Sequence, residues 1–326
     1  MVHTVVVARI ALVLGAGGTV GHGFHAGVLA ALAEHGWDGG QADVLVGTSA
    51  GSIVASLLRA GMPAADIARR AAGAPLSPAG AAVVRRAALT PPGARRMPPR
   101  SRRPAGRAAS PARLARALRA PWAVSAGSLA AAVLPEGRVP TEQIGAPFGA
   151  LYGGSWPSPA LWIVAVALDT GRRTVFGRDS TDVTVADAVR ASCAIPAFFE
   201  PIEIGGHRYV DGGVHSTTNA DLVAGARPDL VLISAPMSAA RRATGFAVDL
   251  PMRQFARLSL TREVAGLRGR GIPVVAFQPT AADLAVMRGD ALDPAKLAPV
   301  CAQVRESTAR RLARADIAER LRPLLG

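Results

Sequence analysis

The chain has 326 residues, of which 50% are apolar and only 4% are aromatic, so its core must consist mainly of Ala, Val and Leu. Such a core suits helices packed on a buried sheet. Lys and Arg outnumber Asp and Glu by 37 to 23, a formal net charge of +14, and two cysteines are too few for a disulfide framework. The first apolar run carries Arg9 and ends in glycines without a cleavage site, so we expect a cytoplasmic protein without a secretory signal.

Two strand-turn-helix units open the chain. Residues 9–14 are predicted to form a buried strand, followed by a glycine-rich turn and a helix over 23–34. Residues 43–46 are a second apolar run, followed by a helix over 50–59. A strand followed at once by a helix, twice in about sixty residues, is typical of a parallel sheet.

The next segment, residues 67–135, has thirteen arginines and no acidic residue. We interpret it as a basic insertion with a Pro-rich centre over 90–111 and a short basic amphipathic helix over 112–120. Three roles stay open: a solvated linker, a lid or membrane contact that binds anionic lipid headgroups, and a nucleic-acid-binding arm. The arginine-rich centre lacks aromatic residues for base stacking, which disfavours nucleic acid. The lipid interpretation predicts peripheral contact at the inner membrane face.

Alternation of strands and helices returns after residue 141. Strands are predicted over 161–167, 230–234 and 272–277, a helix starts at the Thr184 capping box, and residues 294–326 are a charged helical segment. The pattern over residues 1–326 predicts a single three-layer α/β/α sandwich with a mostly parallel central sheet, to which the basic insertion is added.

The sharpest local signal is Gly47-Thr48-Ser49-Ala50-Gly51, a G-x-S-x-G between an apolar strand and an apolar helix. In such an elbow the serine hydroxyl is presented at the carboxyl edge of the sheet, next to the N-terminus of a helix. The competing interpretation is a turn of small residues that packs a helix on a strand. Ser52 is a second hydroxyl, but it lies inside the helix and lacks flanking glycines.

The first turn is a glycine-rich loop, with Gly15, Gly17, Gly18 and Gly21. Successive backbone amides between a strand and a helix N-terminus form a nest for a small anion, such as the oxyanion of an acyl transfer. A dinucleotide-binding loop is the alternative. Its third glycine would fall on Val20, so the spacing disfavours it.

A third motif follows a short strand, where Asp211 enters the turn Gly212-Gly213. Alone, an Asp-Gly-Gly is an ordinary turn. It becomes informative because it comes after a glycine nest and a serine elbow, in that order.

Together these segments resemble the patatin-like phospholipases, a family of α/β lipid acyl hydrolases with a Ser-Asp dyad. The resemblance rests on the loop LVLGAGGTVGHGFHAGVLAAL, the elbow GTSAGS and the stretch ASCAIPAFFEPIEIGGHRYVDGG. It implies Ser49 as the nucleophile, Asp211 as the base and the amides of Gly17, Gly18 and Thr19 as the oxyanion hole. The remaining motif glycines are Gly15, Gly21, Gly47, Gly51, Gly212 and Gly213.

Two residues depart from the family pattern: Ala16 stands where glycine is common, and Val20 where Arg or Lys is frequent. Backbone donors survive both changes, so we expect activity with a different substrate preference. The expected reaction is hydrolysis of phospholipid or lysophospholipid esters through a Ser49 acyl-enzyme, without metal or organic cofactor. The alternatives are a soluble esterase, thioesterase or acyltransferase of the same fold, and a non-catalytic protein that binds anionic membranes or other polyanions.

Histidines near these motifs keep a triad open as well. His22 and His25 open the helix after the glycine loop, and His207 and His215 flank the Asp-Gly-Gly turn. None has metal-ligand spacing with partners. Asp169 ends a strand at a turn, and we interpret it as structural.

Overall fold

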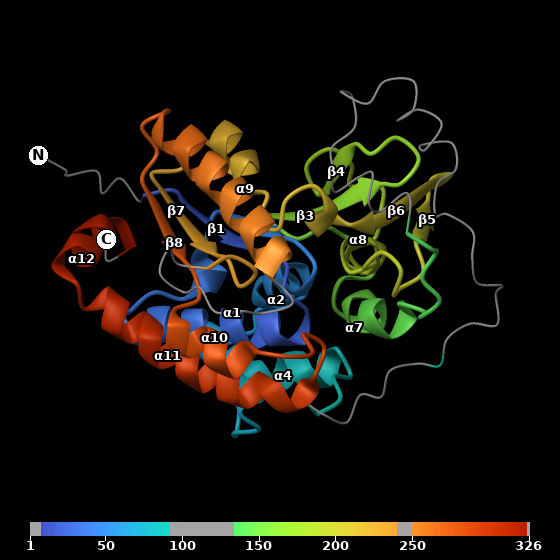
Figure 1. Ribbon diagram of the computed structural model, residues 1–326. Helices are drawn as coiled ribbons and strands as arrows, with labels where there is room; N and C mark the ends of the chain where they lie inside the picture. Colours follow the sequence, from blue (N-terminus) through green and yellow to red (C-terminus); the bar gives the residue numbers. More distant parts are fainter. Residues whose placement is uncertain (1–7, 92–98, 100–133, 240–249, 325–326) are drawn as a thin grey trace, which may run out of the picture.

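The computed structural model describes residues 8–91, 99, 134–239 and 250–324. Over these ranges one sheet runs in the order β5-β6-β3-β2-β1-β7-β8, and β4 pairs with β3 (Figure 1). The parallel strands are β1 (Ile10–Leu14), β2 (Val44–Gly47), β3 (Ala160–Ala167), β7 (Leu230–Ser234) and β8 (Val274–Phe277). The strands that pair antiparallel are β4 (Arg173–Phe176), β5 (Ile202–Ile204) and β6 (His207–Asp211).

Helices cover both faces of this sheet. On one face lie α1 (Gly18–Glu34), α2 (Ala50–Arg59), α8 (Val185–Ser192) and α11 (Leu297–Leu312). On the other face lie α9 (Leu250–Arg268) and the short helix η4 (Ala220–Ala226). Figure 1 shows α9 and α11 on opposite sides of β7 and β8. The expected mixed α/β fold with a mostly parallel sheet between helical layers is confirmed.

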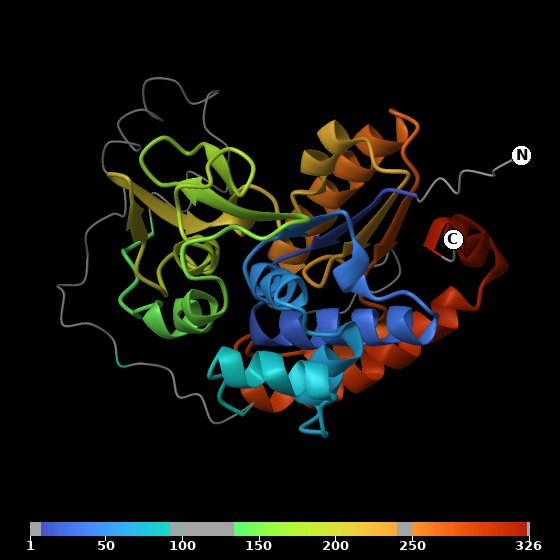
Figure 2. The same cartoon turned by 180° about the vertical axis from the view of Figure 1, so that it is seen from behind.

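Further helices extend the α1 side of the sheet. They are α3 (Ala64–Ala71), α4 (Pro78–Arg86), α7 (Glu142–Tyr152), α10 (Ala281–Met287) and α12 (Ala315–Arg320). In Figure 2, α4 (cyan) lies outside α1 (blue), on the side away from the sheet. Within the described ranges, no helix combines the length and the hydropathy that a bilayer crossing requires.

The two faces explain why the central strands could be recognised from the sequence. In β1, Leu12 and Leu14 pack into the core that holds α1, while Ala11 and Val13 pack toward α9. All residues of this strand are buried. A strand covered on both sides needs apolar residues at every position, which produces a continuous apolar run in the sequence.

The predicted bounds of β7 and α2 agree with the structure, but the predicted start of the first helix is wrong. Helix α1 begins at Gly18 and not at residue 23. Its glycines lower helix propensity, yet they allow a close approach to α11. A Cβ on Gly27 would lie 2.6 Å from the Cys301 carbonyl oxygen. Tertiary packing thus stabilises a helix that propensity alone disfavours.

The boundary of the basic insertion also needs correction. Its expected first residue, Ile67, is 1% exposed in α3, and Val83 of α4 is 3% exposed in the same core. Arg69, Arg85 and Arg86 of these helices are exposed, whereas Ile67 and Val83 pack inward. The basic composition of the segment therefore concealed two folded helices. The predicted Pro-rich centre and the predicted helix over 112–120 lie outside the described residues, except for residues 90, 91 and 99.

Candidate active site

Ser49 lies between β2 and α2, at the carboxyl end of the sheet. Its backbone has φ 54° and ψ −122°, a conformation that costs a residue with a side chain about 1–3 kcal/mol. Ser49 is 4% exposed. Its carbonyl oxygen accepts a 2.7 Å hydrogen bond from Ser52 Oγ, so the competing hydroxyl points back toward the elbow. Strain of this kind occurs mainly at functional sites.

Close backbone contacts explain the glycines on both sides of the serine. A Cβ on Gly51 would lie 1.9 Å from the Leu14 carbonyl oxygen, and one on Gly47 would lie 2.5 Å from Ser52 Cα. Both distances are shorter than any tolerated contact. The elbow therefore requires glycine at these positions, because α2 begins directly against the ends of β1 and β2.

Asp211 ends β6, which is separated from β2 by β3 alone. The Ser49 side chain lies close enough to the Asp211 carboxyl to lower its pKa, and Asp211 Oδ1 accepts a 2.7 Å bond from Gly213 N. Asp211 is 5% exposed. Burial raises the pKa of Asp211 to about 6, against the smaller opposing effects of the Ser49 side chain and the Gly213 amide. The carboxylate is thus a stronger base than an exposed aspartate.

The backbone of the elbow is fixed by Ser192, the last residue of α8. Ser192 Oγ accepts a 2.9 Å bond from Ser49 N and donates a 2.7 Å bond to the Val164 carbonyl. The neighbouring Cys193 thiol is buried beside Ser52 Oγ, and burial raises its pKa. Cys193 therefore stays protonated at neutral pH and is not a competing nucleophile.

The glycine loop lies against both other motifs. Ala16 N donates a 2.7 Å bond to the Thr217 carbonyl, and a Cβ on Gly21 would lie 3.7 Å from Ala50 Cβ. The loop amides with backbone partners are those of Gly15, Ala16, Val20 and Gly21. In contrast, the amides of Gly17, Gly18 and Thr19 have no hydrogen-bond partner in the part of the chain that the structure describes. The residues expected to form an oxyanion hole are the ones with unused donors.

None of the histidines pairs with Ser49 or Asp211 among the described residues. His25 is buried; its Nε2 donates a 2.8 Å bond to the Gly15 carbonyl, and Nδ1 accepts a 2.7 Å bond from Ser234 Oγ. Burial lowers the pKa of His25 to about 3, so this ring stays neutral and fastens the glycine loop to β7.

The other histidines have separate environments. Burial, with a smaller effect of Arg70, lowers the pKa of His22 to about 4. His207 Nδ1 lies 2.7 Å from Asp169 Oδ2 at the surface, which agrees with a structural role for this aspartate. His215 is exposed. No three His, Cys, Asp or Glu side chains within the described ranges converge to hold a metal ion.

A polar residue that the sequence did not single out joins the elbow to the Asp-Gly-Gly turn. Asn219 adopts the left-handed conformation, with φ 55°. Its Nδ2 lies 3.1 Å from Thr48 Oγ1 and 2.6 Å from the Ser216 carbonyl oxygen, with a longer contact to Gly212 O. Its Oδ1 accepts a 3.1 Å bond from Arg173 Nη1. One side chain therefore contacts the neighbours of both Ser49 and Asp211.

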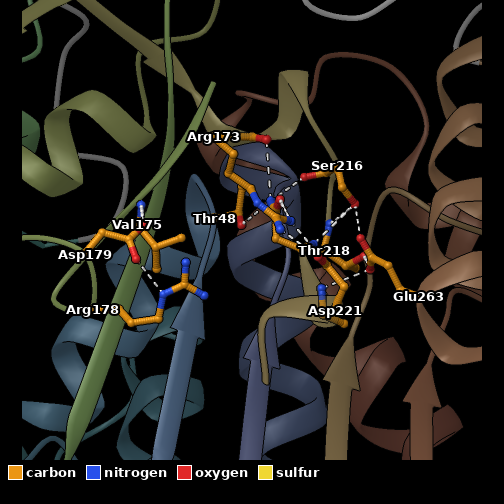
Figure 3. Close-up of polar contacts among 12 residues, drawn as sticks. Thr48, Arg173, Val175, Arg178, Asp179, Ser216, Thr218, Asp221 and Glu263 are labelled. Carbon is orange, nitrogen blue, oxygen red and sulfur yellow. Dashed lines mark hydrogen bonds and ion pairs between the residues drawn. The ribbon is translucent and has the colours of Figure 1, made fainter. Parts of the chain in front are cut away.

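The turn that carries Asn219 is itself fixed by a carboxyl group from α9. Glu263 accepts hydrogen bonds from Ser216 Oγ at 2.6 Å, Thr218 Oγ1 at 2.5 Å and Ala220 N at 3.0 Å (Figure 3). Burial raises the pKa of Glu263. In the sequence, the only indication of this network near residue 219 is the asparagine itself, a residue type that tolerates the left-handed conformation. Asn219 and Glu263 each have partners in distant segments of the chain.

Comparison with known proteins bears on the segment that contains Asp211. Residues 162–224 match the family model for patatin-like phospholipases. The resemblance inferred from the motifs is thus confirmed over the part of the chain from β3 to η4. The patatin-like match supports a hydrolase that acts on lipid acyl esters in general terms. The chain is also similar to the crystal structure of VipD from Legionella pneumophila, with 13% sequence identity and a TM-score of 0.43; the match covers 94% of this chain and 67% of that one.

Proposed function

We propose that this protein is a phospholipase A or lysophospholipase that hydrolyses esters through an acyl-enzyme at Ser49, with Asp211 as the general base. The observation that carries the proposal is that the Ser49 side chain lies close enough to the Asp211 carboxyl to affect its pKa, and that both residues are buried. The patatin-like match supports the substrate class.

In the proposed reaction, Asp211 accepts the Ser49 proton while Oγ attacks the ester carbonyl carbon. The protonated carboxyl group gives this proton to the leaving alcohol oxygen as the ester C–O bond breaks. It then takes a proton from the water that attacks the acyl-enzyme and returns that proton to Ser49 Oγ as the fatty acid is released. With a pKa of about 6, Asp211 is mostly ionised at pH 7 and still basic enough to share a proton with a hydroxyl. The strained elbow holds Oγ at the N-terminus of α2, where the helix dipole favours negative charge.

Stabilisation of the oxyanion is assigned to the amides of Gly17, Gly18 and Thr19. Each donor of this kind is worth about 3 kcal/mol in the transition state of acyl transfer. Their lack of other partners supports the assignment, because the donors are available without breaking existing hydrogen bonds. Val20 is buried where the family often has a cation, so the proposed hole depends on backbone dipoles.

Labelling with a fluorophosphonate probe tests the nucleophile. We expect a single modified residue, Ser49, and no labelling of the Ser49→Ala variant. The matched control is Ser52→Ala, which removes a hydroxyl three residues away and should retain labelling. Ser49→Ala and Asp211→Asn should each lower hydrolysis of a phospholipid by at least about 10³-fold. Labelling elsewhere, or normal turnover by either variant, would refute the dyad.

A substrate panel separates the proposal from its alternatives. Release of fatty acid from a defined phospholipid or lysophospholipid, dependent on Ser49, supports the proposed activity. Labelling of Ser49 with turnover of short soluble esters or thioesters alone would indicate an esterase or thioesterase of the same fold. Absence of labelling would favour a polyanion-binding protein. A cytoplasmic location with peripheral contact to anionic membranes stays a prediction from the sequence.

A further inference from the structure

A cavity of about 740 Å³ lies beside the edge strand β8. Its walls come from α9 and α11, which flank β8 in Figure 1, with contributions from α1 and the start of α10. A second cavity of about 330 Å³ shares Thr261, Gln278 and Arg311 with the first. Neither Ser49 nor Asp211 lines these two cavities, so they are separate from the candidate active site.

The charges of the larger cavity are unbalanced. Arg257, Arg311 and Arg314 line it, while Asp283 is the only carboxylate among its described lining residues. Arg314 pairs with Asp316 at 3.0 Å, but Arg257 and Arg311 have no ion pair in the described part of the chain. Two guanidinium groups therefore share a concave site without a counter-charge of their own.

Asp283 does not supply that counter-charge, because it is committed to the start of α10. Its Oδ2 accepts 2.8 Å bonds from Thr280 N and Oγ1 and a 3.1 Å bond from Ser307 Oγ. The residue is 1% exposed. Oδ2 of this lining carboxylate thus serves as a helix cap, while Oδ1 is buried without a hydrogen-bond partner in the described part of the chain.

The Arg311 side chain is fixed by two contacts, although burial and a neighbouring arginine disfavour its positive charge. Its Nη1 donates a 2.6 Å bond to the Ala276 carbonyl, and its guanidinium carbon lies 5.3 Å from the centre of the Phe277 ring. Burial, and then the like charge of Arg314, lower the pKa of Arg311. A fixed, partly desolvated cation beside another cation gains free energy when an anion binds.

We propose that this cavity binds an organic phosphate ester, with Arg257, Arg311 and Arg314 as ligands of the phosphoryl group. Guanidinium groups match the oxygens of a phosphate with paired donors, which favours this anion where several arginines converge. The cavity has the volume of sites for drug-sized molecules, far more than a phosphate ion fills. Phe24 and Leu258 supply apolar lining for the organic part of the ligand.

Titration calorimetry with the full chain tests the proposal. The probes are inorganic phosphate, glycerol 3-phosphate and a short-chain dialkyl ether analogue of phosphatidic acid, which lacks a cleavable ester. The variants Arg257→Gln and Arg314→Gln each remove one proposed ligand, and the control Arg262→Gln removes the same charge from an exposed position on α9. We expect each ligand variant to weaken ester binding about tenfold, the typical effect of one charge-assisted hydrogen bond. The control should bind like the wild type.

The outcomes identify the source of the phosphoryl group. Tighter binding of glycerol 3-phosphate than of the ether lipid would assign the site to a soluble phosphate ester, and the reverse order would assign it to a lipid headgroup. No saturable binding of any probe, equal affinity for inorganic phosphate and both esters, or equal weakening by Arg257→Gln and Arg262→Gln would overturn the proposal. Because Ser49 lines neither cavity, loss of hydrolysis in Ser49→Ala leaves this result unaffected.

Discussion

Replacement of Asp211 by asparagine should make the protein more stable at neutral pH while abolishing the proposed activity. Burial raises the pKa of Asp211 from an ordinary value of 3.8 to about 6. Between these two values the folded protein retains a proton that the unfolded chain releases, so the free energy of unfolding falls as pH rises across this window. The difference corresponds to a stability cost of about 3 kcal/mol above pH 7. Asparagine has the same shape and carries no charge, so the variant avoids this cost.

Thermal unfolding at several pH values measures the effect. At about 2.1 cal/mol/K of unfolding entropy per residue, about 3 kcal/mol raises the Tm of a chain of this length by about 4 °C. We expect this increase at pH 8 and almost none at pH 3, where Asp211 is mostly protonated in both states. The control Asp169→Asn should not be stabilising at pH 8. Burial raises the pKa of Asp169, but the hydrogen bond from His207 and smaller effects together outweigh burial and the pKa is lowered overall, so the ionised form of Asp169 stabilises the fold. An unchanged or lower Tm for Asp211→Asn at pH 8, or a gain of the same size at pH 3, would refute the reasoning.

Three further predictions concern the base, its support and the elbow. Because Asp211 must be ionised to accept a proton, kcat/KM for a soluble ester should rise about tenfold per pH unit below pH 6 and level off above it; a flat profile from pH 4.5 to 7 would exclude Asp211 as the base. Asn219→Gly keeps the φ of 55° and deletes the bridging amide, so kcat should fall about 10- to 100-fold while circular dichroism is unchanged, and full activity would remove its positioning role. Gly51→Ala should destabilise by about 3 kcal/mol in urea, whereas Gly266→Ala, with open space in α9, should be neutral or stabilising; equal effects would contradict the contact argument.

The central strands were predictable because burial on both faces leaves a continuous apolar run, as in β1 and β7. The short antiparallel strands β4 and β5 lack this signal. Helix α7 contains Pro147, which ordinarily argues against a helix. For α3 and α4, outward-facing arginines dominated the composition and hid the few buried residues. The sequence pattern of a segment predicts its secondary structure only where all of its residues share one environment, such as burial on both faces.

Some residues of the candidate site could likewise be predicted from the sequence, and others could not. Ser49 and Asp211 each lie in a turn whose glycines leave a local signature, and the order of the turns made the pair recognisable. Asn219 and Ser192 act through contacts to segments far away in the chain, so no neighbouring residue signals them. The role of His25 also required coordinates, because its separation from Asp211 and its bond to the glycine loop are properties of the fold.

The hydrogen bonds along β8 affect whether copies of this protein can associate through this edge strand. An edge strand offers a row of carbonyls and amides to which another strand can add, a common start of aggregation. On β8, Arg268 donates to the Val274 carbonyl at 3.2 Å and Arg311 donates to the Ala276 carbonyl. Two acceptors that an incoming strand would need are thus already occupied by charged side chains. Arg311, which the proposed anion site also uses, and Arg268 should therefore hinder pairing of β8 with a strand of a second copy.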